Sequence, residues 1–237
     1  MDEVIGVFLE TGALAVLGLA GAVFMRRQFR FKWFLVALAL NLFYQVLLTR
    51  GFWLVPSPVH GLSWNWVGKL AAIAGTIVVM SLPAFGWRRC GATLHQGRQW
   101  RGALVVLAML GGLFFYLALS AADGRDDLET ILFQWTMPGL DEELFYRGTL
   151  LLALNEAFRS RTRVLGAPIG FGGVLSTILF GLTHALSYEH GLIEFDTFSF
   201  AITGVPAILL LWLRERTGSL VMPVIGHNMA NGAATLF

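Results

Sequence analysis

Eight apolar stretches take up most of this 237-residue chain, and each is close to the length of a membrane span, roughly 17 to 25 residues. A backbone inside lipid must satisfy its own hydrogen bonds, which a helix does within each segment. We therefore predict an all-α polytopic membrane bundle of about eight transmembrane helices, forming a single domain over residues 1–237. The predicted spans cover residues 4–25, 33–48, 66–85, 103–122, 131–154, 171–187, 198–213 and 219–237.

The composition favours lipid over water. Hydrophobic residues make up 56% of the chain and charged residues only 14%, whereas a soluble domain carries about 25% charged residues. We expect an integral, multi-pass membrane protein of a prokaryotic inner or plasma membrane. Its partners would be membrane lipid and a membrane-anchored or lipidated protein or peptide, and no nucleic acid.

The basic residues alternate along the chain. Thirteen of the seventeen lysines and arginines fall in every second connection, at residues 26–32, 88–101, 159–163 and 214–216. The other connections are mostly acidic. The positive-inside rule places the basic connections in the cytoplasm, so both termini are expected outside.

The fifth stretch holds ionisable residues in apolar surroundings. Residues 137–148 read Met-Pro-Gly-Leu-Asp-Glu-Glu-Leu-Phe-Tyr-Arg-Gly. Charges inside a membrane are costly, so such residues are a functional hypothesis by default. Pro138 suits the first turn of a new helix, and we predict that the span is broken near residues 138–139.

Helical spacing assigns different roles to the two adjacent glutamates. Residues four apart share a helix face, so Glu143 can pair with Arg147. Glu142 does not match that face, and we predict that it projects into a cavity as the free carboxylate that a general base requires. The alternative is that these charges form a purely structural network between helices.

Two later stretches each contain a histidine. His184 follows Phe180 by four residues in the sixth stretch, and His227 shares a face of the last stretch with Asn231. Either histidine alone is more often a packing residue, but together with the fifth stretch they indicate a site in the core, residues 131–237. The charge map places Glu142 and His184 in the outer half of the membrane.

These residues match three motifs of a known family. Glu142-Glu143-x-x-x-Arg147, Phe180-x-x-x-His184 and His227-x-x-x-Asn231 occur in order, and the chain resembles the CPBP (Abi) family of intramembrane proteases, which includes the type II CAAX prenyl endopeptidases. The resemblance implies an endopeptidase without a covalent intermediate. Its general base would be Glu142, and His184 would help to position the attacking water.

The resemblance also implies roles for the remaining motif residues. His227 and Asn231 would stabilise the oxyanion, a contribution of roughly 3 to 4 kcal/mol per good donor. Glu143 and Arg147 would be supporting residues. No cofactor is then needed.

Two other functions are compatible with this sequence. The first is a zinc-dependent protease, because two histidines and a glutamate, here His184, His227 and Glu142, are a known zinc ligand set. The second is a non-enzymatic membrane immunity or scaffold protein of the same fold. Among proteases, the sequence leaves open CAAX-type, leader and C-terminal sorting-anchor substrates.

Overall fold

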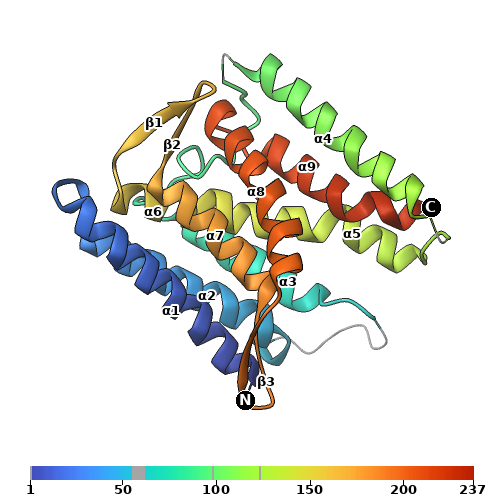
Figure 1. Cartoon of the computed structure of the whole chain (residues 1–237), viewed down its shortest axis with the longest axis horizontal. Helices are drawn as coiled ribbons and strands as arrows, with labels where there is room; N and C mark the ends of the chain where they lie inside the picture. Colours follow the sequence, from blue (N-terminus) through green and yellow to red (C-terminus); the bar gives the residue numbers. More distant parts are fainter. Residues whose placement is uncertain (1, 55–61, 98, 123) are drawn as a thin grey trace.

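The structure, a computed structural model, describes residues 2–54, 62–97, 99–122 and 124–237 as a bundle of helices with two short β-hairpins (Figure 1). The first half of the chain forms long helices. These elements are α1 (Asp2–Phe24), the 3₁₀ helix η1 (Arg26–Gln28), α2 (Phe31–Leu54), α3 (Trp66–Ser81) and α4 (Trp100–Ser120).

The second half is more broken. One continuous helical segment is formed by α5 (Leu128–Glu142), the π-helical η2 (Glu143–Leu150) and α6 (Leu151–Ala157). The elements that follow are β1 (Arg161–Val164), β2 (Ala167–Gly170), α7 (Phe171–Ala185), β3 (Leu186–Glu189), β4 (Leu192–Phe195), α8 (Thr197–Thr217), α9 (Val221–Gly232) and the 3₁₀ helix η3 (Ala233–Leu236).

Each of the eight predicted apolar stretches is mainly helical, which confirms the fold class. Among the described residues, four helices are long and apolar enough to cross a membrane, at Ile5–Phe24, Phe31–Arg50, Trp100–Ser120 and Thr197–Thr217. The apolar helices α3 and α7 are shorter. These helices fit an integral membrane protein, while the count of eight crossings stays a prediction.

Polar side chains fix where several helices begin. Asn65, Asp127 and Asp196 each accept a hydrogen bond from a backbone N–H in the first turn of α3, α5 and α8. These N–H groups have no partner within the helix, so the caps define the helix starts. At the other end, α8 stops at Gly218, whose φ of 72° is the left-handed conformation that glycine adopts without strain.

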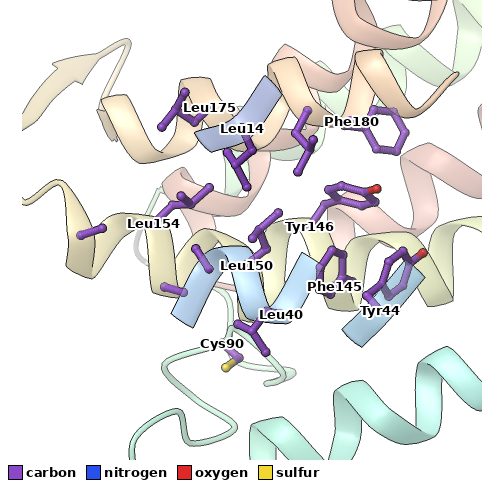
Figure 2. Packing of buried hydrophobic residues seen from close by; sticks show 14 of the residues in the cluster. Leu14, Leu40, Tyr44, Cys90, Phe145, Tyr146, Leu150, Leu154, Leu175 and Phe180 are labelled. Atoms are coloured by element: carbon purple, nitrogen blue, oxygen red, sulfur yellow. The ribbon is translucent and has the colours of Figure 1, made fainter. Parts of the chain in front are cut away.

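The segment α5–η2–α6 runs through the middle of the bundle, between α1 and α2 on one flank and α4 on the other (Figure 1). Figure 2 shows the larger core, in which leucines from α1, α2, η2, α6 and α7 meet: Leu14, Leu40, Leu150, Leu154 and Leu175. A smaller core joins α4, α8 and α9. The central segment therefore carries its charges between two apolar layers.

The four basic connections lie at one end of the bundle. Backbone hydrogen bonds link Arg30 to Ala157, at 2.9 Å, and Gly97 to Thr217, at 2.8 Å, and Arg89 pairs with Glu156 at 2.9 Å. At the opposite end, Asp126 bonds the backbone of Thr235. The basic connections thus meet at one end, as the charge map predicts, while the assignment of that end to the cytoplasm stays a prediction.

The predicted break at Pro138 is wrong, because α5 continues through it to Glu142. The neighbouring Gly139 N–H donates to Asn228 Oδ1 at 2.8 Å, so α9 supplies a partner beside the proline. A Cβ at position 139 would lie 2.5 Å from that same oxygen, which explains the glycine. The irregularity comes later, as the π-helical turns of η2, which often occur at functional sites.

The two β-hairpins were not predicted from the sequence. Both hairpins turn through two residues with positive φ, Leu165-Gly166 and His190-Gly191, as the tight turns between antiparallel strands require. The β3–β4 hairpin starts directly after α7 and contacts α1. It therefore lies beside the last turn of α7, which carries His184.

Candidate active site

Three helical segments bring motif residues to one point. Glu142 ends α5, His184 is in the last turn of α7, and His227 lies within α9. The Oε2 atom of Glu142 lies 3.6 Å from His227 Nε2 and 4.0 Å from His184 Nε2. The structure thus assembles the predicted base with both histidines, while their catalytic roles stay predictions.

Glu143 forms the ion pair that helical spacing predicts. Its Oε1 atom lies 2.9 Å from Arg147 Nη1, and the side chains are 0% and 1% exposed. The same oxygen lies 2.7 Å from His227 Nδ1, and the Arg147 guanidinium stands 4.3 Å from the centre of the Phe180 ring. Glu143 therefore fixes the ring of His227 and neutralises Arg147 in a closed, buried network.

His184 is held by its own helix. Its Nδ1 lies 2.9 Å from the carbonyl oxygen of Phe180, and a carbonyl only accepts hydrogen bonds. Nδ1 therefore carries a proton in this arrangement, and Nε2 faces Glu142. This bond explains the four-residue spacing between Phe180 and His184, since the carbonyl of a helical residue points toward the next turn.

The sequence predicted that the Glu142 carboxylate is free. This prediction is wrong, because Lys69 of α3 binds one of its oxygens. Lys69 Nζ lies 2.8 Å from Glu142 Oε1. The other oxygen, Oε2, is buried without a hydrogen-bond partner among the described residues and faces the two histidines. One half of the carboxylate is therefore anchored, and the other half is available for chemistry.

The same lysine joins a second carboxylate. Lys69 Nζ lies 3.0 Å from Asp141 Oδ2, which also accepts a hydrogen bond from the Tyr44 hydroxyl at 2.8 Å. The Asp141 side chain is 0% exposed. The three consecutive carboxylates thus divide into two networks, with Asp141 and Glu142 on Lys69 and Glu143 on Arg147 and His227.

Asn231 lies one turn beyond His227 on α9 but is not bonded to this cluster. Its Nδ2 donates to Gln134 Oε1 at 3.3 Å, which leaves the second N–H of the amide for another acceptor. Asn228, which the motif does not include, bonds the backbone of α5 instead. The structure therefore joins five of the six predicted residues and places Asn231 beside them on the same helix.

Two cavities meet at His184. A polar cavity of about 450 Å³ lies between α1, α2, α7 and β3, and its lining includes Glu10, Gln45, Glu142 and His184. An apolar cavity of about 750 Å³ lies between α4, α7, α8 and α9, and it is lined by His184, His227 and Asn231 among many apolar side chains. The motif residues therefore stand at the boundary between a polar and an apolar space.

Sequence reasoning missed Lys69 and Tyr44 and gave Asp141 no role. Lys69 carried a usable signal, since it is the only charged residue in its apolar stretch, 66–85. Glu10 carries the same signal in the first stretch, and Gln45 bonds it at 2.5 Å. Tyr44 had no such signal, because a tyrosine in an apolar helix is ordinary.

The zinc alternative needs Glu142, His184 and His227 as ligands. Within the described ranges, no three His, Cys, Asp or Glu side chains form a group that could hold a metal ion. The Lys69 ammonium already supplies positive charge to Glu142 at 2.8 Å. Metal removal, described below, therefore separates the zinc alternative from a metal-free reaction.

Comparison with known proteins yields one family. Residues 125–233 match the family described as Rce1-like type II CAAX prenyl endopeptidases. No curated protein and no solved structure matches the chain. The matched segment begins just before α5 and ends in η3, so it includes all three motifs. Over this segment the chain is similar to the Rce1-like type II CAAX prenyl endopeptidases, the relationship that its motifs indicated.

Proposed function

We propose that this protein is a glutamate-dependent intramembrane endopeptidase, which hydrolyses a peptide bond of a membrane-associated protein or peptide with an activated water. The observation that carries the proposal is the position of Glu142 Oε2. It has no hydrogen-bond partner among the described residues, and two imidazole nitrogens face it at 3.6 and 4.0 Å.

This arrangement suits a water molecule. Both distances exceed a direct hydrogen bond, and a water between the groups can donate to Glu142 Oε2 and to His184 Nε2. Glu142 would take the proton of that water as the hydroxide oxygen attacks the scissile carbonyl carbon. The same proton would then pass to the leaving nitrogen as the C–N bond breaks, so the step releases a carboxylic acid and an amine.

The tetrahedral intermediate carries negative charge on oxygen, and α9 offers the donors for it. The second N–H of Asn231 is one donor. His227 would be the other through Nε2 when its ring carries both protons, with Nδ1 donating to the Glu143 carboxylate 2.7 Å away. Both residues line the apolar cavity, so the carbonyl would approach from that side.

The apolar cavity supports a membrane-associated substrate. Its walls come from α4 and α8, two of the helices that are long and apolar enough to cross lipid. The family description makes the C-terminal segment of a prenylated protein the first substrate to test. A leader peptide and a C-terminal sorting anchor are the other two.

The test is hydrolysis by the purified protein in liposomes. A panel of the three substrate classes is incubated in H₂¹⁸O, and the products are analysed by mass spectrometry. We expect one class to be cut at a single bond, with one ¹⁸O atom in the new carboxyl group. Wild-type protein that is folded but cuts no member of the panel, or whose products equal those of Glu142→Gln, would contradict the proposal.

A further inference from the structure

We infer that Lys69 is a positioning residue for Glu142, an inference that rests on the proposed function. Lys69 belongs to α3, in the half of the chain that the family match does not cover. Its ammonium holds Oε1 of Glu142 and thereby directs Oε2 at the two histidines. The reacting half of the site would then depend on a residue from the other half of the chain.

The distances show that Lys69 does more than neutralise Asp141. Its Nζ lies 2.8 Å from Glu142 Oε1 and 3.0 Å from Asp141 Oδ2, so both contacts are hydrogen bonds with full charges. A lysine that only needed a counter-ion would be satisfied by Asp141, which is completely buried. The contact to Glu142 instead fixes a side chain that borders an open cavity and would otherwise rotate.

The lysine is itself held rigidly. Asp141 accepts the Tyr44 hydroxyl at 2.8 Å, and the Tyr44 ring stacks on Phe145 with centroids 3.9 Å apart and planes 5° from parallel. Figure 2 shows these two rings side by side at the edge of the larger core. The order of contacts is therefore Phe145, Tyr44, Asp141, Lys69 and Glu142, and it runs from packed core to reacting carboxylate.

Charge balance points the same way. Asp141, Glu142 and Glu143 are consecutive carboxylates, and Arg147 faces only the last of them. Without Lys69, Asp141 and Glu142 would be neighbouring buried carboxylates with no lysine or arginine partner in the described chain, an arrangement that disfavours two ionised groups. Lys69 therefore helps to keep Glu142 as a carboxylate, the form that a general base needs.

The experiment compares three variants at Lys69 in the liposome assay. Lys69→Met should lower kcat by about 10- to 100-fold, the usual loss when a partner that orients a reacting group is removed. KM should stay within about twofold, since Lys69 lines neither cavity. Lys69→Arg should restore part of the lost kcat, because it keeps the charge and the donors.

Chemical rescue separates positioning from mere folding. Lys69→Ala should regain activity when n-propylamine is added, because a small ammonium can occupy the vacated space and donate to both carboxylates. Trimethylamine, which has a single N–H when charged, should rescue less. Arg214→Met is the matched control, since Arg214 is also buried but, within the described part of the chain, bonds only the backbone carbonyls of Arg147 and Arg89. Neither amine should change its activity.

The outcomes distinguish this inference from the proposed function. If wild type cuts no substrate, the proposed function fails first. If wild type is active and Glu142→Gln is not, a Lys69→Met protein with wild-type kcat overturns the inference alone. Should Lys69→Met fail to fold, rescue of Lys69→Ala by propylamine supports the inference, and a folded Lys69→Ala protein that propylamine does not rescue overturns it.

Discussion

The two cavities that meet at His184 differ in the polar groups that line them. The polar cavity is lined by carboxylates, an amide and hydroxyl groups, and it reaches from the β3–β4 hairpin to Glu142. The apolar cavity is larger and is walled by leucine, isoleucine and phenylalanine side chains, with His227 and Asn231 as its polar floor. One space suits water, and the other suits a lipid-like chain.

This difference shows how one site can bring water to an apolar substrate. Hydrolysis needs water and the substrate at the same point, although the hydrocarbon core of a membrane excludes water. Glu142 faces the polar side and the proposed oxyanion donors face the apolar side, whereas Glu143 and Arg147 are completely buried and line neither cavity. The following predictions test whether the two cavities have separate roles in the reaction.

The largest effect is expected on the polar side. Glu142→Gln removes the base and should lower kcat by about 10²- to 10⁴-fold, the range for general acid–base catalysis. The glutamine oxygen can still accept from Lys69, so thermal stability should change little. Cleavage assays and melting curves on the same preparation measure both quantities. An active variant would show that the base is another residue.

The buried pair, which lines neither cavity, should mainly affect stability. Glu143→Gln leaves Arg147 without its carboxylate, and removing one member of a buried ion pair costs about 3–5 kcal/mol. The control is Glu156→Gln, whose arginine partners are about half exposed, so its loss should cost about 1 kcal/mol or less. Unfolding in detergent is the measurement, and equal stabilities for the two variants would contradict the buried pair.

Exchanging the charges of this pair should not restore stability. Glu143→Arg with Arg147→Glu keeps the four-residue spacing, but it places a guanidinium where His227 Nδ1 now lies 2.7 Å from a carboxylate. We therefore expect the double variant to unfold at least as easily as Glu143→Gln. Recovery to wild-type stability would mean that His227 contributes nothing to the pair.

On the apolar side, Asn231→Ala tests the proposed oxyanion donor. Loss of one such donor should lower kcat by about 10²-fold, with KM nearly unchanged. Asn228→Ala is the control, because among the described residues Asn228 bonds only the backbone of Gly139, and it lines neither cavity. It should lower stability without a comparable loss of kcat. If the two variants lose kcat equally, Asn231 has no special place in the reaction.

Filling the apolar cavity should affect binding. Ala230 lines that cavity, and Ala230→Phe should raise KM for an apolar substrate about tenfold, equivalent to about 1.4 kcal/mol. Ala74→Phe adds the same ring on an exposed position of α3 that lines neither cavity, and its KM should match wild type. A change in kcat alone for Ala230→Phe would argue against a substrate channel there.

The smallest effect is expected from metal removal. Because Lys69 occupies one oxygen of Glu142, incubation with a strong zinc chelator should leave kcat within about twofold of its starting value. The assay uses protein purified and reconstituted in metal-free buffer. A loss of activity that added zinc restores would return the function to the metalloprotease alternative.

The sequence predicted those parts of the fold that depend on local spacing. The apolar stretches predicted the helices, charge alternation predicted which connections share an end, and the four-residue step predicted the pair of Glu143 with Arg147. Pro138 was misjudged because its effect depends on a distant partner, Asn228, which satisfies the neighbouring N–H. No local rule contains that information.

The candidate site was predictable only where a motif or an unexpected charge marked it. His184 and His227 were identified by spacing, and the structure brings both to Glu142. Lys69 could have been found from its isolation in an apolar stretch, but its two partners lie more than seventy positions away along the chain. The cavities arise from packing among helices, so the sequence alone could not divide the motif residues between them.

The order in which the site's residues are synthesised has a consequence for the cell. Lys69 is made first, Glu142 and Glu143 follow, and His227 comes only in α9, so α9 must be synthesised before these groups can meet. Chains generally fold from the N-terminal side as they emerge. A nascent chain that stalls before α9 would lack both proposed oxyanion donors. It could therefore not cleave other proteins of the host membrane.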